Sequence, residues 1–151
     1  MSGGGDEDQP ADVRGRRGHR LLPHTADLRL QAWAEDREQC LAEAVMGVVG
    51  HFASTAGVRA ASVVAVRLTG SGEELLAGLL DEVVFRLEVH GQVPVDVEVR
   101  TAAEGGVEAR LAMAALADVE IVGAVPKGVS WHGLRIGPDG SGWSCLVTVD
   151  V

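Results

Sequence analysis

The sequence contains few aromatic residues and few cysteines. Aromatic side chains make up 3% of its 151 residues, and tyrosine is absent. This scarcity argues against an RNA-binding sheet, which stacks nucleic-acid bases on exposed rings. Cys40 and Cys145 lie far apart in amphipathic segments, where an unpaired cysteine usually behaves as a small buried hydrophobe. A disulfide or a nucleophilic thiol is the less favoured interpretation.

Basic residues are also in the minority. The chain has 13 basic and 22 acidic residues, which gives a formal net charge of -9. Such a charge repels phosphate backbones, so strong direct nucleic-acid binding is not expected, and cations or basic protein surfaces are better-matched partners. The 20 glycines form no G-x-G-x-x-G or Walker-type loop between a strand and a helix. No Ser-His-Asp or Cys-His arrangement of the kind used in nucleophilic catalysis is recognisable in the sequence either.

Long apolar runs are missing as well. Gly, Glu or His interrupts each apolar stretch before it reaches the length of about 18 residues that a membrane-spanning helix needs. Residues 1–20 contain no apolar block of the kind found in a secretory signal. We therefore expect a cytoplasmic protein that does not contact a membrane. Residues 1–18 are expected to form a disordered tail and residues 19–151 one domain, because 46% hydrophobic residues suffice for a single core.

Hydrophobic periodicity predicts two helices and several strands. Alternation of apolar and polar residues predicts strands over residues 28–34, 62–68, 93–100, 107–115, 129–136 and 143–151. Asp36 and Ser71 each have capping-box spacing and precede apolar residues at helical intervals, which predicts one helix over 37–53 and another after Ser71. This order predicts an α+β fold, a sandwich in which two helices pack on one face of a largely antiparallel β-sheet.

Two aspartates from opposite ends of the domain are candidates for a metal site. Asp27 closes the segment His24-Thr25-Ala26-Asp27 before the first strand, and Asp150 is followed by Val151 as the last residue of the sequence. A strand that runs to Val151 places the Asp150 side chain beside the terminal carboxylate, and two close anions repel unless a cation lies between them. If Asp27 lies on the adjacent strand, the three carboxylates suit Ca²⁺ or Mg²⁺ better than zinc. The alternative is a solvated Asp27 and a frayed chain end.

Polar residues also enter the apolar strand after residue 126. Lys127 could contact a phosphate or a partner's carboxylate as a point charge, although an ordinary surface lysine is the simpler interpretation. His132 is more often a half-buried strand residue than an acid or base, so His132 and His24 are only accessory candidates. We assign no catalytic residue.

Taken together, four segments resemble the archease family. They are His24-Thr25-Ala26-Asp27, the helix with Glu73-Glu74-Leu75-Leu76 and Asp81-Glu82, Lys127-Gly128-Val129-Ser130-Trp131-His132, and Val149-Asp150-Val151. Their order and spacing match the family from about residue 21 to the last residue. The resemblance implies an accessory protein that activates an RtcB-type RNA ligase. Archease proteins promote guanylylation of the ligase and its multiple turnover in tRNA splicing and RNA repair, reactions that use GTP and a divalent metal.

The resemblance also implies roles for single residues. Asp27 and Asp150 would be metal ligands with the carboxylate of Val151 as a third, and Lys127 would match the family's functional lysine. Ca²⁺ is the first choice of cation, with Mg²⁺ or Mn²⁺ as alternatives, and GTP would be contacted within the complex. The chain departs from the family at Pro23, where an acidic residue is frequent, and over residues 117–125, which are more apolar. Further metal ligands from 117–125 therefore stay an open question.

Two other classes of function stay open. One is a small metal-dependent hydrolase, in which the cation activates water and His24 or His132 transfers protons. The other is a general chaperone-like binding module, for which the acidic residues would be incidental. Metal-dependent turnover by the protein alone distinguishes the first, and partner binding that survives metal removal distinguishes the second.

Overall fold

The computed structural model describes residues 16–22 and 27–151. In chain order the elements are β1 (Gly18–Leu22), β2 (Leu28–Ala34), α1 (Arg37–Phe52), β3 (Ala53–Ser54), β4 (Ser62–Leu68), α2 (Gly72–His90), β5 (Gln92–Thr101), η1 (Ala103–Gly105), β6 (Val107–Ala115), η2 (Leu116–Asp118), β7 (Glu120–Ile121), β8 (Gly128–Asp139) and β9 (Gly142–Asp150).

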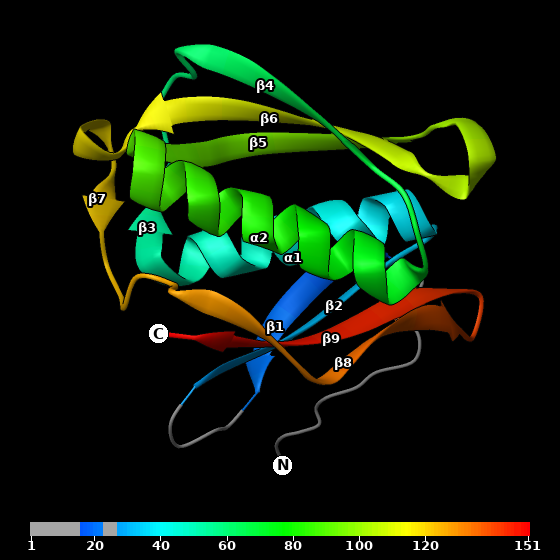
Figure 1. Ribbon diagram of the computed structural model, residues 1–151. Helices are drawn as coiled ribbons and strands as arrows, with labels where there is room; N and C mark the ends of the chain where they lie inside the picture. The colour runs from blue at the N-terminus through cyan, green and yellow to red at the C-terminus, as the bar shows by residue number, and fades with distance from the viewer. Residues whose placement is uncertain (1–15, 23–26) are drawn as a thin grey trace.

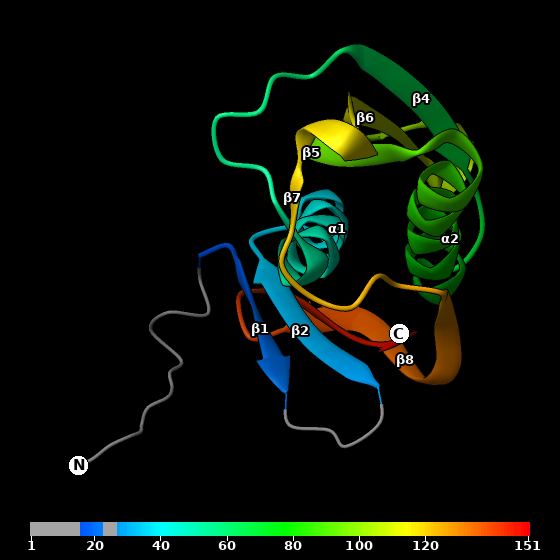
Figure 2. The same cartoon turned by 90° about the vertical axis from the view of Figure 1, so that its left-hand side faces the viewer.

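The helices lie between two antiparallel sheets (Figure 1 and Figure 2). One sheet has the strand order β1-β2-β9-β8 and the other β4-β6-β5, while β3 and β7 form a short pair of their own. Helix α1 contacts β2 and β5, and α2 contacts β8 and β5, so each helix packs against both sheets. The α+β class is confirmed, with both helices on one face of the four-stranded sheet. A second sheet covers the opposite side of the helices.

Residues of the four-stranded sheet alternate between the core and solvent. Leu28 and Leu30 of β2 and Val147 and Val149 of β9 are buried against the helices. Each such side chain contributes about 1.5–3 kcal/mol when it is fully buried. The intervening residues point away from the helices, and we call this side of the sheet the outer face. The predicted alternation of residues 28–34 and 143–150 is therefore confirmed.

Both helices begin where the capping residues predict. The Asp36 carboxylate accepts a hydrogen bond of 2.8 Å from the Gln39 amide. The Ser71 hydroxyl accepts one from the Glu74 amide, and the Glu74 carboxylate accepts one from the Ser71 amide, which completes a capping box. Within the described part of the chain, neither α-helix is long and apolar enough to cross a membrane.

Strand β1 is an element that the sequence pattern did not predict. It pairs with β2 and places Gly18 opposite Trp33. A Cβ atom at Gly18 would lie 2.5 Å from Cζ2 of Trp33, so the indole requires a glycine here. Residues 1–15 of the predicted tail lie outside the described residues, and Gly18, where that tail was expected to end, is the first residue of β1.

Strand β8 contains a large bulge. Ser130 pairs with Thr148, but the next pair is Arg135 with Leu146, so β8 advances five residues while β9 advances two. The backbone turns through Gly133, whose φ of 75° favours glycine. The bulge carries His132 into an exposed position on this edge strand.

Candidate functional site

Asp27 and Asp150 lie at the same end of neighbouring strands. The last pair between β2 and β9 is Leu28 with Val149, and continuing this register by one residue sets Asp27 opposite Asp150. Opposed residues of antiparallel strands have Cα atoms about 4.5–5.5 Å apart and side chains on the same face. Since Leu28 and Val149 point to the core, both aspartates belong to the outer face. Asp27 is half-buried and Asp150 is exposed.

The start of β8 completes this end of the sheet. The Lys127 amide donates a hydrogen bond of 2.7 Å to the carbonyl oxygen of Asp150, and Gly128 pairs with Asp150. A Cβ atom at Gly128 would lie 3.8 Å from Oδ2 of Asp150, so the carboxylate lies over this glycine. Val151 is half-buried against the core. The structure therefore brings Asp27, Lys127, Asp150 and Val151 to one end of the sheet.

A depression of about 300 Å³ lies beside Asp27 on the outer face. It is lined by Asp27, Arg29, Ser130, His132, Gly133, Leu146 and Thr148. The bulge of β8 forms one wall and supplies the imidazole. A carboxylate, a guanidinium, two hydroxyls and an imidazole thus border one hollow, which offers partners for both a cation and an anion.

The donor set at this end of the sheet suits a hard cation. Within residues 16–22 and 27–151, no group of three or more His, Cys, Asp or Glu side chains is placed to hold a metal. Two opposed carboxylates nevertheless fit Mg²⁺ or Ca²⁺, because these ions accept carboxylate oxygens and fill the remaining positions with water or carbonyl groups. The main-chain oxygens of Val151 directly follow Asp150 in the chain. His24 lies outside the described residues.

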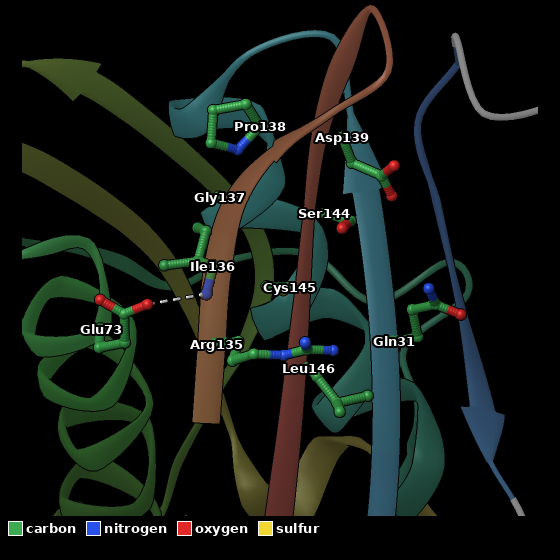
Figure 3. Close-up of a pocket in the computed structure, with 10 residues that line it drawn as sticks. All are labelled: Gln31, Glu73, Arg135, Ile136, Gly137, Pro138, Asp139, Ser144, Cys145 and Leu146. Atoms are coloured by element: carbon green, nitrogen blue, oxygen red, sulfur yellow. Dashed lines mark hydrogen bonds between the residues drawn. The ribbon is translucent and has the colours of Figure 1, made fainter. Parts of the chain in front are cut away.

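A second depression of about 350 Å³ adjoins the first on the outer face (Figure 3). Leu146 lines both hollows. The other lining residues of the second are Gln31, Glu73, Arg135, Ile136, Gly137, Pro138, Asp139, Ser144 and Cys145. Glu73 accepts a hydrogen bond of 3.2 Å from the Ile136 amide, which ties the start of α2 to β8.

Carboxylates on the two helices have shifted pKa values. A hydrogen bond with His19 and the nearby charge of Arg17 hold the pKa of Glu43 below its ordinary value, against the effect of burial. Burial raises the pKa of Asp81. Glu43 lies on α1 and Asp81 on α2. The Glu43 shift therefore arises from its contacts with His19 and Arg17, and the Asp81 shift arises from burial.

Comparison with known proteins identifies the family. The model of the Archease protein family (MTH1598/TM1083) matches residues 19–151. The chain belongs to the archease family. It is 42% identical over 135 residues to the "Probable protein archease" of Mycobacterium tuberculosis, in the strains CDC 1551 / Oshkosh and ATCC 25618 / H37Rv. This match covers 89% of the archease described here and 75% of each relative.

Two solved structures share the fold of this archease. Protein 1598 of Methanobacterium thermoautotrophicum superposes with a TM-score of 0.72 at 19% identity, and the match covers 89% of this chain and 99% of that one. A Thermotoga maritima archease, described as a possible chaperone, superposes with a TM-score of 0.61 at 15% identity, covering 87% and 96% of the two chains. At these identities the likeness concerns the fold alone.

Sequence reasoning missed three residues that line the hollow beside Asp27. Arg29 lies two residues after Asp27 in an alternating strand, so its place on the same face was readable from the pattern. Thr148 lies two residues before Asp150 in an alternating strand, so its place on the face of Asp150 was readable in the same way. Ser130 enters the hollow through the register of β8, and no sequence signal fixed that register ahead of the bulge.

Proposed function

We propose that this archease is a metal-binding accessory protein that activates an RtcB-type RNA ligase in tRNA splicing or RNA repair. It promotes guanylylation of the ligase and its multiple turnover, and it is not itself an enzyme. The resemblance to the archease family suggests this partner, and family membership supports it. The cytoplasmic location expected from the sequence is part of the same proposal.

The opposed aspartates are the observation that carries the proposal. Continuing the β2–β9 register one residue beyond the Leu28–Val149 pair sets Asp27 opposite Asp150, and two carboxylates brought close together in this way would be stabilised by a cation between them. We propose Asp27 and Asp150 as its ligands, with the main-chain carboxylate of Val151 as a third. Ca²⁺ is the first choice, and Mg²⁺ or Mn²⁺ are alternatives. The cation is presented at an exposed end of the sheet, where a partner's active site can reach it.

Lys127 is the second element of this surface. Its side chain is exposed, and its backbone is fixed to Asp150. An ammonium group beside the cation can stabilise phosphate charge during guanylylation, so we propose that Lys127 contacts the ligase or the phosphates of GTP in the complex. Lys127 is the only lysine of the chain. An amine-reactive crosslinker therefore tests the contact directly, because any crosslink to the ligase must come from Lys127 or the amino terminus.

The deciding experiment measures guanylylation of a cognate RtcB-type ligase under limiting turnover. Wild type is expected to stimulate the reaction, and Asp27→Asn is expected to lose most of the stimulation. Asp96→Asn is the matched control, because Asp96 is an exposed aspartate on β5 of the other sheet. Equal stimulation by wild type and Asp27→Asn would show the proposal to be wrong.

Two other functions each have one supporting observation. His132 and Asp27 line the same hollow, which is the arrangement of a metal-dependent hydrolase. Turnover of a model phosphoester by the purified protein, lost in Asp150→Asn, would favour that function. The Thermotoga maritima archease is described as a possible chaperone, which fits a general binding module. Partner binding that persists after metal is removed would favour the module.

A further inference from the structure

The outer face continues beyond the aspartate pair as two rows of side chains that cross the strands. The first row runs over β8, β9 and β2 and consists of Ser130, Thr148 and Arg29. The second runs over β8, β9, β2 and β1 and consists of Arg135, Leu146, Gln31 and Arg20. Neighbouring rows are two residues apart along a strand, which is about 7 Å. Arg29 on β2 and Arg135 on β8 therefore stand on either side of β9, in neighbouring rows.

These two arginines differ from most others in the chain. Ion pairs with carboxylates are made by Arg17, Arg37, Arg67, Arg86, Arg100 and Arg110. Among the described residues, Arg29 and Arg135 make no ion pair. The chain has 22 acidic residues, so carboxylates are plentiful, yet this part of the outer face keeps two guanidinium charges available to an external anion.

The two arginines border adjoining hollows. Arg29 lines the hollow beside Asp27, Arg135 lines the second, and Leu146 lies in both. In Figure 3 the side chain of Arg135 extends from β8 across β9 in the direction of Gln31. A ligand over Leu146 therefore lies between the two arginines. The hydroxyls of Ser130 and Thr148 border the same space.

We propose that these adjoining hollows bind the polyphosphate group of a small phosphorylated ligand. Arg29 and Arg135 hold the phosphate oxygens through their forked N–H groups, and the hydroxyls of Ser130 and Thr148 donate further hydrogen bonds. The volumes of about 300 and 350 Å³ lie in the range of small-molecule sites.

Charge at the two ends limits the size of the anion. Asp27 borders the first hollow, and Glu73 and Asp139 border the second. A long polyanion such as RNA must pass one of these carboxylates and meets a chain of net charge -9. The phosphate site therefore favours a compact ligand.

The site also adjoins the proposed cation. Arg29 follows Asp27 by two residues on the same face, about 7 Å along the strand. Mg²⁺ is commonly held by one or two carboxylates together with the phosphates of a ligand, rather than by protein groups alone. The polyphosphate would thus complete the coordination of a cation at Asp27 and Asp150. This coupling rests on the proposed metal site, whereas the two arginine contacts do not.

Calorimetric titration of the full chain with inorganic pyrophosphate, in EDTA and in Mg²⁺, tests the site. Arg29→Gln and Arg135→Gln should each weaken binding about tenfold, because each removes a charged hydrogen-bond donor. Arg59→Gln is the matched control, since Arg59 is exposed, lies outside both hollows and makes no ion pair with described residues. It should stay within about twofold of wild type. Melting temperatures of the variants establish that they are folded.

The outcomes separate the phosphate site from the metal site. If wild type binds pyrophosphate in EDTA and Arg29→Gln does not, the phosphate site is supported. If Asp27→Asn gains as much pyrophosphate affinity from Mg²⁺ as wild type does, the proposed metal ligands are rejected while the phosphate site stands. Absence of pyrophosphate binding in both conditions overturns the proposal. Equal affinity for pyrophosphate in wild type and both arginine variants also overturns the proposal. So does tighter binding of single-stranded RNA than of pyrophosphate, if the RNA binding depends on the same arginines.

Discussion

The backbone amide of Lys127 donates a 2.7 Å hydrogen bond to the carbonyl oxygen of Asp150. The start of β8 is thereby fixed to the end of β9 without the lysine side chain. Replacing that side chain leaves the bond in place. The charge of Lys127 can therefore be removed while Asp150 stays where it is.

We expect Lys127→Ala to separate the two parts of the proposed function. Its Ca²⁺ affinity should stay within about twofold of wild type, because the exposed ammonium is not a metal ligand and is screened by solvent. Its stimulation of ligase guanylylation should fall strongly, with partial recovery in Lys127→Arg. Calorimetry and a guanylylation assay measure the two quantities. A Lys127→Ala protein that stimulates like wild type would remove the lysine from the mechanism.

Removal of either aspartate should weaken cation binding. Asp27→Asn and Asp150→Asn each replace a charged ligand by a neutral one, and Ca²⁺ affinity depends on the number of charged ligands. We expect a loss of about tenfold or more for each variant in calorimetric titration with Ca²⁺. Asp96→Asn, on the other sheet, should bind as wild type does. Unchanged affinity in both aspartate variants would mean that the cation, if bound, lies elsewhere.

A carboxyl-terminal extension tests the third proposed ligand. Val151 packs against the core beside Asp150, so added residues would convert its main-chain carboxylate to a neutral amide while its side chain keeps the same place. We expect a protein tagged after Val151 to bind Ca²⁺ more weakly than one tagged before Met1. Equal affinities of the two tagged forms would exclude the Val151 carboxylate from the site.

Much of the fold, and the face of the sheet to which each aspartate belongs, could be predicted from local sequence patterns. Alternating residues fixed which side of β2 and β9 faces the core, and this alternation set Asp27 and Asp150 on the same face. The pairing of β2 with β9 was only an assumption at that stage. It depends on long-range packing against α1, which no local pattern encodes.

The elements that were missed lack a local hydrophobic signal. Strand β1 is mostly exposed and is held by its backbone pairing with β2, so no alternating run marks it. The second sheet was missed as a separate layer, although nine residues of α1 are buried, a broader surface than one sheet covers. The bulge of β8 depends on the register of β8 against β9, and Gly133 alone was too weak a signal for it.

Replacing either of two glycines in α1 by alanine should change the stability of the protein, in opposite directions for the two positions. A Cβ atom at the buried Gly47 would lie 2.8 Å from a methyl carbon of Leu30 and 3.0 Å from the His19 ring, while nothing lies within 4 Å of one at the exposed Gly50. We expect Gly47→Ala to lower the free energy of unfolding by about 1–3 kcal/mol through overpacking. Gly50→Ala should raise it by about 0.5–1 kcal/mol, because alanine favours the helix. Urea unfolding measures both, and equal shifts would contradict this packing.

Lowering the pH should weaken the attachment of β1 to α1, because the Glu43 carboxylate that contacts Arg17 and His19 becomes protonated. Arg17 donates to the Glu43 carboxylate at 2.8 Å, and His19 lies 3.0 Å from its other oxygen. The hydrogen bond with His19 and the charge of Arg17 lower the pKa of Glu43 from its ordinary 4.5. A lowered carboxyl pKa gives stability that is present above the ordinary value and is lost as the pH falls through the folded value. The loss therefore occurs below about pH 4.5.

Glu43→Gln isolates this contribution. At about pH 5.5 the wild type should exceed the variant in free energy of unfolding by roughly 1–3 kcal/mol, the value of hydrogen bonds to a charged group. The difference should shrink towards about pH 3, where the wild-type carboxyl is protonated as well. Over the same range, the protection factors of the β1 amides against hydrogen exchange should fall in wild type. Glu88→Gln, at an exposed position of α2, is the control. If the difference in free energy of unfolding between wild type and Glu43→Gln stays constant down to pH 3, Glu43 does not hold β1 through its charge. The strand would then depend on its backbone pairing with β2 alone.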